Sequence, residues 1–366
     1  MRPDLIEFEP TEEQQLIVDT VRQFAANEIR PQAHDAAEAR KLPENLLAQA
    51  HELGLVALGL DEAHGGGGDR SAVTGALIAE ELAYGDLAIA LAILSPSLIG
   101  LPVTEFGTGP QKAEILPALL GPSFNAGSLA LIEPDFRFDP FRPTTRATRD
   151  GGDYTLRGRK CFVPWLDSGD QVLVIAMEDD DPQAFLVPRK THGLSATPER
   201  NLGLDALPTV ELELDDVRVP ASARLGGDAG CDVHSIIDRG RVALAATAVG
   251  VSRAAFEIAR DYAKEREAFG ALIATKQAIA FKIADMAIEI DAARLLVWEA
   301  AWLLDSGAKA TREAVLASRQ AAQVARVVTD GAVQVLGGYG YIRDYLPEML
   351  HRNACGFTTF GTLTLI

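Results

Sequence analysis

Two glycine-rich segments are the first candidates for chemistry, because glycine loops can bind the phosphate groups of nucleotides. The run Gly65–Gly68 is not followed by the Gly-Lys-Ser/Thr sequence of a phosphate-binding loop, so we predict a flexible connection there. The segment Gly337–Gly340 lacks the spacing and the preceding strand of a dinucleotide-binding fingerprint. Neither segment by itself establishes a cofactor site.

Residue spacing argues against several other kinds of catalytic site. The chain has six histidines but no His-Glu-x-x-His and no Cys-x-x-Cys sequence, so we expect no metal site. Ser123 lacks the second glycine of a nucleophile elbow and is predicted to be a turn residue. Cys161, Cys231 and Cys355 are far apart and odd in number, which fits a reducing cytoplasm better than disulfides. We expect all three to be buried or inert.

Two segments of the C-terminal third resemble signatures of one family. Residues 264–270, Lys-Glu-Arg-Glu-Ala-Phe-Gly, are followed by Gln277 and by Ala-Asp-Met at 284–286, and resemble a signature of the acyl-CoA dehydrogenase family. Residues 334–341, Gln-Val-Leu-Gly-Gly-Tyr-Gly-Tyr, resemble a second signature of the same family. Shorter matches occur in chain order at Phe106-Gly107-Thr108, Glu133-Pro134, Gly158-Arg159-Lys160 and Val217-Arg218-Val219-Pro220.

The resemblance implies FAD as the cofactor, in a site shared between subunits of an oligomer. In the family, one subunit surrounds the flavin ring, and the bundle of its neighbour holds most of the pyrophosphate and adenine. Arg266 would neutralise the pyrophosphate, a charge-assisted contact worth roughly 1.5 to 3 kcal/mol; a solvated charge on a helix is the alternative. The other residues implied in binding the cofactor are Phe269, Gln277, Gln334, Gly337, Gly338 and Thr362.

The positions that would supply the catalytic base hold other residues. Family members remove the α-proton of the thioester with a glutamate while the flavin accepts the β-hydride. The usual Glu-Gly-Thr triplet is matched by Phe360-Gly361-Thr362, and the position used by a minority of members, just before Arg241, holds Gly240. Asp238, about 200° around the helix from Gly240, is the one substitute base that we consider. By resemblance Arg241 would bind substrate, although an interface salt bridge is an equal alternative.

The segments matched to the flavin-ring side of the family are also altered. Ile132 and Pro164 stand where the family has threonines, so two hydroxyl contacts to the flavin are missing, each worth about 1 kcal/mol. Phe138 stands where a serine meets the CoA. By this resemblance, the chain lacks several residues that would contact its own flavin ring. It keeps the residues that would bind the pyrophosphate and adenine of a neighbour's flavin.

Helical periodicity predicts that residues 1–126 form a helical domain. A capping-box pattern at Thr11 and Gln14 begins its first helix, which we expect to end at Pro31. A second helix is predicted from residue 43, a proline, to about residue 53. A third helix follows the run of four glycines.

Residues 127–230 show the period of two that is typical of strands. Val210, Leu212 and Leu214 alternate with acidic residues, and similar runs lie between Asp, Gly and Pro turns, which predicts an antiparallel β domain. Residues 231–366 are predicted to be helical again, with helices at 234–265, 275–304 and 312–336. The fold class is α+β and mainly α, which agrees with the family's N-terminal helical domain, β domain and C-terminal four-helix bundle.

Composition limits the possible partners. The chain has 366 residues, 48% of them hydrophobic, and a formal net charge of -18, so we expect no nucleic-acid binding. The apolar stretch 87–103 is broken by Ser-Pro-Ser and is predicted to be too short to span a bilayer. We expect a cytoplasmic protein that is not inserted in a membrane.

Four functional hypotheses remain open. The first is a non-catalytic partner subunit of a heteromeric acyl-CoA dehydrogenase, which completes the FAD site of a catalytic chain; such assemblies in the family often act on bulky substrates such as steroid side chains. The second is a self-sufficient homo-oligomeric acyl-CoA dehydrogenase with a displaced base such as Asp238. The third is a pseudo-enzyme that binds acyl-CoA or a protein without redox chemistry. The fourth is a flavin monooxygenase, which needs no α-proton base.

Overall fold

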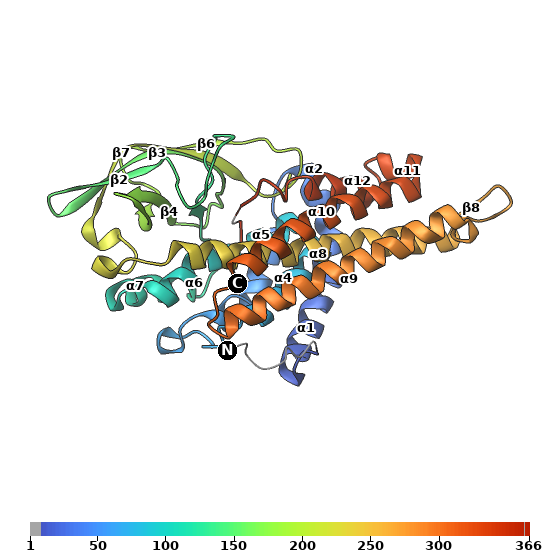
Figure 1. The fold of residues 1–366 in the computed structure, drawn as a ribbon, viewed down its shortest axis with the longest axis horizontal. Coiled ribbons are helices and arrows are strands. Elements are labelled where there is room, and N and C mark those ends of the chain that lie inside the picture. Colours follow the sequence, from blue (N-terminus) through green and yellow to red (C-terminus); the bar gives the residue numbers. More distant parts are fainter. Residues whose placement is uncertain (1–8, 362) are drawn as a thin grey trace.

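The chain folds into an N-terminal group of helices, a central sheet and a C-terminal group of long helices (Figure 1). The computed structural model describes residues 9–361 and 363–366. The long helices α8 (Val233–Glu265), α9 (Gln277–Asp305) and α10 (Thr311–Leu336) run side by side along the length of the molecule. Each lies within two residues of its predicted bounds. The sheet covers one end of this helical body.

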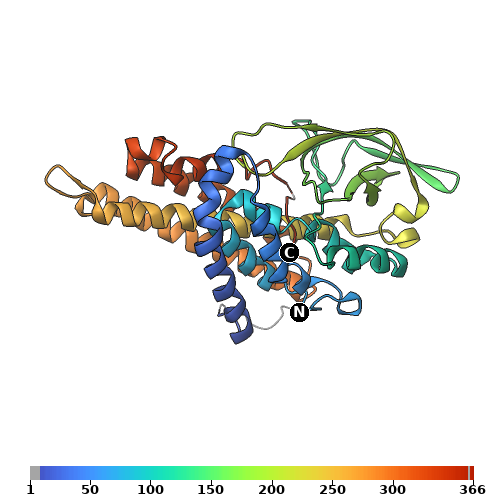
Figure 2. The same cartoon turned by 180° about the vertical axis from the view of Figure 1, so that it is seen from behind.

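The first helix does not end at Pro31. A capping box at Thr11 begins α1 (Glu12–Phe24) as predicted, but a π-helical turn at Ala25–Ile29 then leads directly into α2 (Arg30–Ala39). Pro31 sits in the first turn of α2, where its missing N–H causes little loss. Seen from behind, α1 and α2 form one nearly continuous helix across the long helices (Figure 2).

Helix α4 (Ala72–Gly85) packs against α1 and α2. The predicted second helix is confirmed as α3 (Glu44–Glu52), with Pro43 at its N-cap. Helix α4 follows the glycine run, is buried along nearly its whole length and packs on α8. Helix α7 (Gly109–Leu119) begins with a second capping box and lies beneath the sheet.

The apolar stretch after α4 is long enough to be tested as a membrane span. Leu87–Phe106 and Val233–Glu265 both meet the length and hydropathy criteria for crossing a membrane. The expectation that the first of these segments is too short to span a bilayer is therefore wrong. In Leu87–Phe106 the most apolar window is 94% buried, and the segment is divided into α5 (Leu87–Ile93) and α6 (Ser97–Phe106). Burial of this kind is typical of core helices.

The central domain is a seven-stranded sheet of mixed direction. Strand β5 pairs with the whole length of β4, whereas β1 and β2 pair with different parts of β4. From β2 the sheet continues through β3 and β7 to β6. The other strand pairs are antiparallel as expected, but β1 and β2 run parallel to β4. Alternation of apolar residues reports which face is buried, whereas strand direction depends on long connections. The strands are β1 (Leu129–Ala130), β2 (Arg146–Asp150), β3 (Asp153–Pro164), β4 (Gln171–Glu178), β5 (Asp181–Pro188), β6 (Leu194–Pro198) and β7 (Thr209–Pro220).

Close packing of small residues holds the long helices together. Helix α8 contacts α4, α9 and α10, and the shared core is rich in alanine. At Gly250 a Cβ atom would lie 2.2 Å from the Glu80 carbonyl oxygen, so this glycine lets α8 approach the α4 backbone. The C-terminal helical domain is completed by the short helices α11 (Gly338–Tyr341) and α12 (Leu346–Ala354).

Candidate functional site

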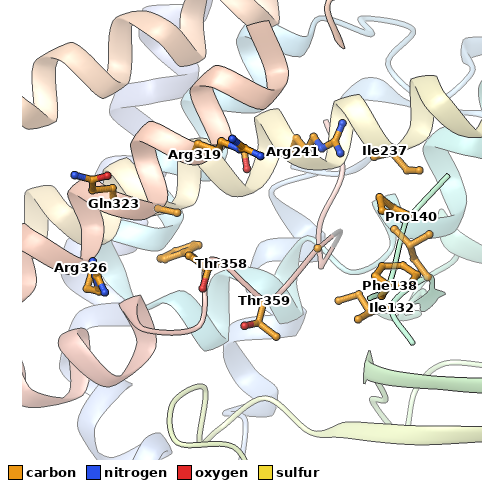
Figure 3. Close-up of a pocket in the computed structure, with 15 residues that line it drawn as sticks. Ile132, Phe138, Pro140, Ile237, Arg241, Arg319, Gln323, Arg326, Thr358 and Thr359 are labelled. Carbon is orange, nitrogen blue, oxygen red and sulfur yellow. The ribbon is translucent and has the colours of Figure 1, made fainter. Parts of the chain in front are cut away.

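A large cavity lies where the sheet domain meets the long helices (Figure 3). Its volume is about 610 Å³, and its walls come from α8, α10, the segment after β1 and the loop after α12. The lining residues are Leu131, Ile132, Phe138, Pro140, Ile237, Arg241, Ser318, Arg319, Ala322, Gln323, Arg326, Phe357, Thr358, Thr359 and Gly361. None of these residues is an aspartate, a glutamate or a histidine.

Phe360, at the first of the two positions considered for a base, belongs to the hydrophobic core. Its side chain is 5% exposed, and its ring meets that of Phe357 edge to face, with the ring centroids 5.7 Å apart. The ring also lies against Gly356, where a Cβ atom would clash with it. Phe360 therefore fills the core behind the cavity wall.

Asp238, the candidate substitute base, also lies outside the cavity lining. Its buried carboxylate accepts hydrogen bonds from Thr311 Oγ1 at 2.6 Å and from Arg241 Nη1 at 3.1 Å. Gly240 is buried as well. Arg241 does line the cavity, and its guanidinium lies 5.1 Å from the centre of the Phe141 ring. The structure thus places Arg241 at the cavity, and a hydrogen bond to Asp238 holds the Arg241 side chain there.

A buried ion pair anchors the segment that forms one cavity wall. Lys160 is fully buried, and its Nζ donates to Glu133 Oε1 and to the Leu131 carbonyl, both at 3.0 Å. The Glu133 carboxylate also accepts from the backbone N–H and the hydroxyl of both Thr144 and Thr145. Although burial opposes ionisation, Lys160 and these hydrogen bonds lower the Glu133 pKa to about 2. Burial lowers the Lys160 pKa to about 8.

Sequence reasoning named Glu133 and Lys160 only as family matches and missed their pairing. The sequence did contain a signal for this pairing, because Lys160 occupies an inward position of an alternating strand. A buried lysine requires a buried partner for its charge. Phe138 lines the cavity, whereas Phe162 and Trp165 do not. Phe162 has a positive φ of 53°, and its N–H donates to Glu199.

A second cavity, of about 400 Å³, contains several of the predicted cofactor residues. Arg266, Gly337 and Gly338 line it together with Tyr339. Both glycines have open space where a Cβ atom would stand, and Gly337 has a positive φ of 60°. Arg266 lies 5.7 Å from the centre of the Tyr339 ring and has no acidic partner among the described residues. This open cradle beside a free guanidinium fits the pyrophosphate of FAD.

The other predicted cofactor residues do not line this second cavity, although Phe269 and Gln334 are sequence neighbours of residues that do. Phe269 is at the turn between β8 (Glu267–Ala268) and β9 (Ala271–Leu272), is 97% exposed and has a positive φ of 53°. A bulky residue in this conformation is strained, as is common at binding sites. Gln277 and Gln334 are exposed at the ends of α9 and α10. Thr362 lies outside the described residues.

The two cavities are far apart within one chain. The β8–β9 hairpin lies at the end of the long helices opposite the sheet (Figure 1). The large cavity instead has residues of the segment after β1 in its lining. No group of three or more metal-ligating side chains occurs within residues 9–361 and 363–366. Cys161 is buried and Cys231 partly buried, and burial raises the pKa of these thiols to about 12 and about 11. Cys355 is exposed, so of the two expected alternatives, buried or inert, only an inert thiol remains as a prediction for it.

Comparison with known proteins assigns the family. The acyl-CoA dehydrogenase N-terminal domain profile matches residues 11–121, the middle domain profile 128–217 and the C-terminal domain profile 232–361. The chain belongs to the acyl-CoA dehydrogenase family, a family of flavoprotein oxidoreductases whose cofactor is FAD.

Individual relatives agree over nearly the whole chain. Probable acyl-CoA dehydrogenase YngJ of Bacillus subtilis is 36% identical, over 95% of this chain and 93% of its own. The butyryl-CoA dehydrogenase structure from Megasphaera elsdenii has a TM-score of 0.88 at 32% identity, covering 98% of this chain and 97% of its own. A glutaryl-CoA dehydrogenase from Mycobacterium smegmatis in complex with FADH2 has a TM-score of 0.87 at 30% identity, covering 97% and 92%.

Proposed function

We propose that this chain is the non-catalytic subunit of a heteromeric acyl-CoA dehydrogenase. Its role would be to complete the FAD site of a catalytic chain that carries out the α,β-dehydrogenation of an acyl-CoA thioester. The observation that carries the proposal is the absence of any carboxylate or imidazole among the residues lining the large cavity. The separate cradle at Arg266, Gly337 and Gly338 keeps the groups needed to hold the tail of the cofactor.

The division of labour follows from what each group can do. FAD, when bound, supplies the hydride acceptor, and the reaction also needs a base for the α-proton. Loss of such a base costs on the order of 100-fold to 10,000-fold in rate. In this chain Arg266 would neutralise the pyrophosphate and the amides of Gly337 and Gly338 would approach it, while Phe269 would extend toward the neighbouring subunit.

The self-sufficient alternative receives little support. Asp238 would have to abstract the α-proton, but its carboxylate accepts hydrogen bonds from Thr311 and Arg241 and does not line the cavity. The pseudo-enzyme alternative leaves the strained, exposed Phe269 and the open glycine cradle without a role.

Turnover by the isolated chain tests the proposal. The purified protein, supplied with FAD, a series of saturated acyl-CoA thioesters and an artificial electron acceptor, should show no dehydrogenation. Addition of a catalytic chain that carries the Glu-Gly-Thr triplet should restore it, and Arg266→Gln should lower both activity and FAD content of the complex. Dehydrogenation by the isolated chain that is lost in Asp238→Asn would instead establish the self-sufficient enzyme.

A further inference from the structure

One of the three cysteines has a histidine beside it. Cys355 is exposed and directly follows helix α12 as its C-cap, and His351 lies one turn earlier on the same helix. Residues four apart on a helix are neighbours, and the Cys355 Sγ atom lies 3.8 Å from His351 Nε2, within hydrogen-bond reach of sulfur. A thiol in contact with an imidazole is the arrangement that activates cysteine as a nucleophile.

A third residue, on helix α10, determines which nitrogen of His351 carries the proton. Thr329 is fully buried, and its Oγ1 lies 3.0 Å from His351 Nδ1. The hydroxyl donates its one hydrogen to the Ala325 carbonyl oxygen at 2.6 Å, so Oγ1 acts as an acceptor toward His351. His351 Nδ1 therefore carries the proton and donates it to Thr329. In the neutral ring Nε2 then keeps its lone pair, and Nε2 is the nitrogen that faces Cys355.

The neighbouring charged side chains of α12 do not compete for this pair. Arg352 and Glu348 hydrogen-bond each other, and Arg352 also bonds Asp205 in the connection between β6 and β7. In the described part of the chain, neither Glu348 nor Arg352 hydrogen-bonds His351 or Cys355. The lone pair of His351 Nε2 is therefore available to the thiol.

The other two cysteines lack such an arrangement. Cys161 lies buried in β3 and Cys231 is partly buried, and burial raises the pKa of both thiols. The same burial keeps reagents away from them. Within residues 9–361 and 363–366, neither thiol hydrogen-bonds a histidine. A reagent for activated thiols should therefore distinguish Cys355 from the other two.

We propose that Cys355 is a reversible modification site, at which the thiol exchanges with a low-molecular-weight disulfide and His351 acts as the base. The Cys355 sulfur attacks one sulfur of the disulfide and forms a new S–S bond, while the S–S bond of the disulfide breaks. The thiol proton passes to His351 Nε2 and then to the departing thiolate, which leaves as a free thiol. Cys355 is thereby oxidised, and the released half of the disulfide is reduced. Thr329 is a positioning residue, because it acts through His351.

The modified residue would stand close to one wall of the large cavity. Phe357 and Thr358, two and three residues after Cys355, line that cavity. Arg326, one turn before Thr329 on α10, lines it as well. An adduct at Cys355 therefore adds bulk next to the loop that forms this wall. The site replaces the inert thiol expected from the sequence, and it does not depend on the role of the chain in a heteromer.

Reaction of the purified full chain with 4,4′-dithiodipyridine measures the exchange, because each event releases a coloured thiopyridone. Wild type, Cys355→Ser, His351→Gln and Thr329→Val are compared at pH 7 and at pH 9.5. Glutamine is a good helix former and valine has the shape of threonine, so the variants should fold, which circular dichroism checks. His34→Gln is the matched control, because His34 also lies on a helix but contacts a backbone carbonyl and no thiol.

The expected result is one fast-reacting thiol per chain, which is absent from Cys355→Ser. At pH 7, His351→Gln should slow the reaction by at least about fivefold, because an unassisted thiol is only a few per cent ionised at that pH. At pH 9.5 an unassisted thiol is mostly ionised, so the rates of wild type and His351→Gln should agree within about twofold. Thr329→Val should show the same pH-dependent loss to a smaller extent, and His34→Gln should react as wild type does.

Mass spectrometry provides a second measurement. After exposure of wild type to oxidised glutathione, the mixed disulfide should be found on the peptide that carries Cys355, and a reducing agent should remove it. Equal rates in wild type and His351→Gln at pH 7, a loss in His351→Gln that is unchanged at pH 9.5, or no fast-reacting thiol in wild type would overturn the proposal. None of these measurements requires FAD or turnover.

Discussion

At the scale of single residues, the buried pair of Glu133 and Lys160 anchors one wall of the cavity, the segment that carries Leu131 and Ile132. The pair fixes the segment that carries Ile132 and Phe138. The Glu133 carboxylate accepts hydrogen bonds from Lys160 and from the N–H of Thr145, which directly precedes β2. Removal of one partner leaves the other charge buried and unpaired, which typically costs about 3–5 kcal/mol. Changes here should therefore affect the sheet domain before they affect the long helices.

Replacement of Glu133 tests this anchor through its pH dependence. The folded-state pKa of about 2 lies below the ordinary value of 4.5, so the ionised carboxylate stabilises the fold above about pH 4.5. That contribution is lost progressively as the pH falls from 4.5 toward 2. Glu133→Gln should lower the thermal unfolding midpoint at pH 7, and its midpoint should fall less steeply than that of wild type between pH 5 and pH 3. Equal slopes in that pH range would show that the carboxylate is not held as described.

At the scale of elements, the approach of α8 to α4 depends on Gly250. A methyl group there would lie 2.2 Å from the Glu80 carbonyl oxygen, which belongs to the backbone and cannot move aside cheaply. We expect Gly250→Ala to destabilise the protein by about 1–3 kcal/mol through overpacking, despite the better helix propensity of alanine. Chemical denaturation followed by circular dichroism measures the effect.

Gly109 is the matched control for this prediction. It is also helical, at the start of α7, but a Cβ atom there meets no atom within 4 Å. Gly109→Ala creates no contact with another element and should therefore destabilise the protein less than Gly250→Ala, although Pro110 disfavours a helical conformation for the alanine before it. If both variants unfold at the same denaturant concentration, close contact between α4 and α8 does not limit stability.

The elements differ in how far the sequence could predict them. The long helices follow from sustained periodicity over many turns, and the absence of a base at residues 240 and 360 follows directly from residue identity. The continuation of the helix through Pro31 could not be predicted, because a proline that ends a helix and a proline in the first turn of a helix look the same in the sequence. The pairing of Lys160 with Glu133 and the shared cavity of Arg241 with Arg319 join residues distant in sequence, so they became visible only once the elements were packed.

At the scale of the whole molecule, the exposed face of α9 indicates an oligomer. Phe281, Ile288 and Leu295 recur every seven residues and are 60%, 66% and 47% exposed, forming an apolar stripe along the helix. Ile288→Glu should reduce the mass measured by analytical ultracentrifugation, because it places a charge in the middle of the stripe. Leu16→Glu, at a 69% exposed leucine of α1, should leave the mass unchanged. An unaltered mass in Ile288→Glu would place the interface elsewhere.

In the proposed assembly, this chain holds the tail of a flavin whose ring belongs to another subunit. The most direct measurement is the visible absorption spectrum of the purified chain, with the FAD-to-protein ratio determined after denaturation. We expect little or no FAD in the isolated chain, and recovery of bound FAD when a catalytic chain is added. A full complement of one FAD per isolated chain would contradict it, because the altered ring-side residues would then be sufficient to hold the flavin.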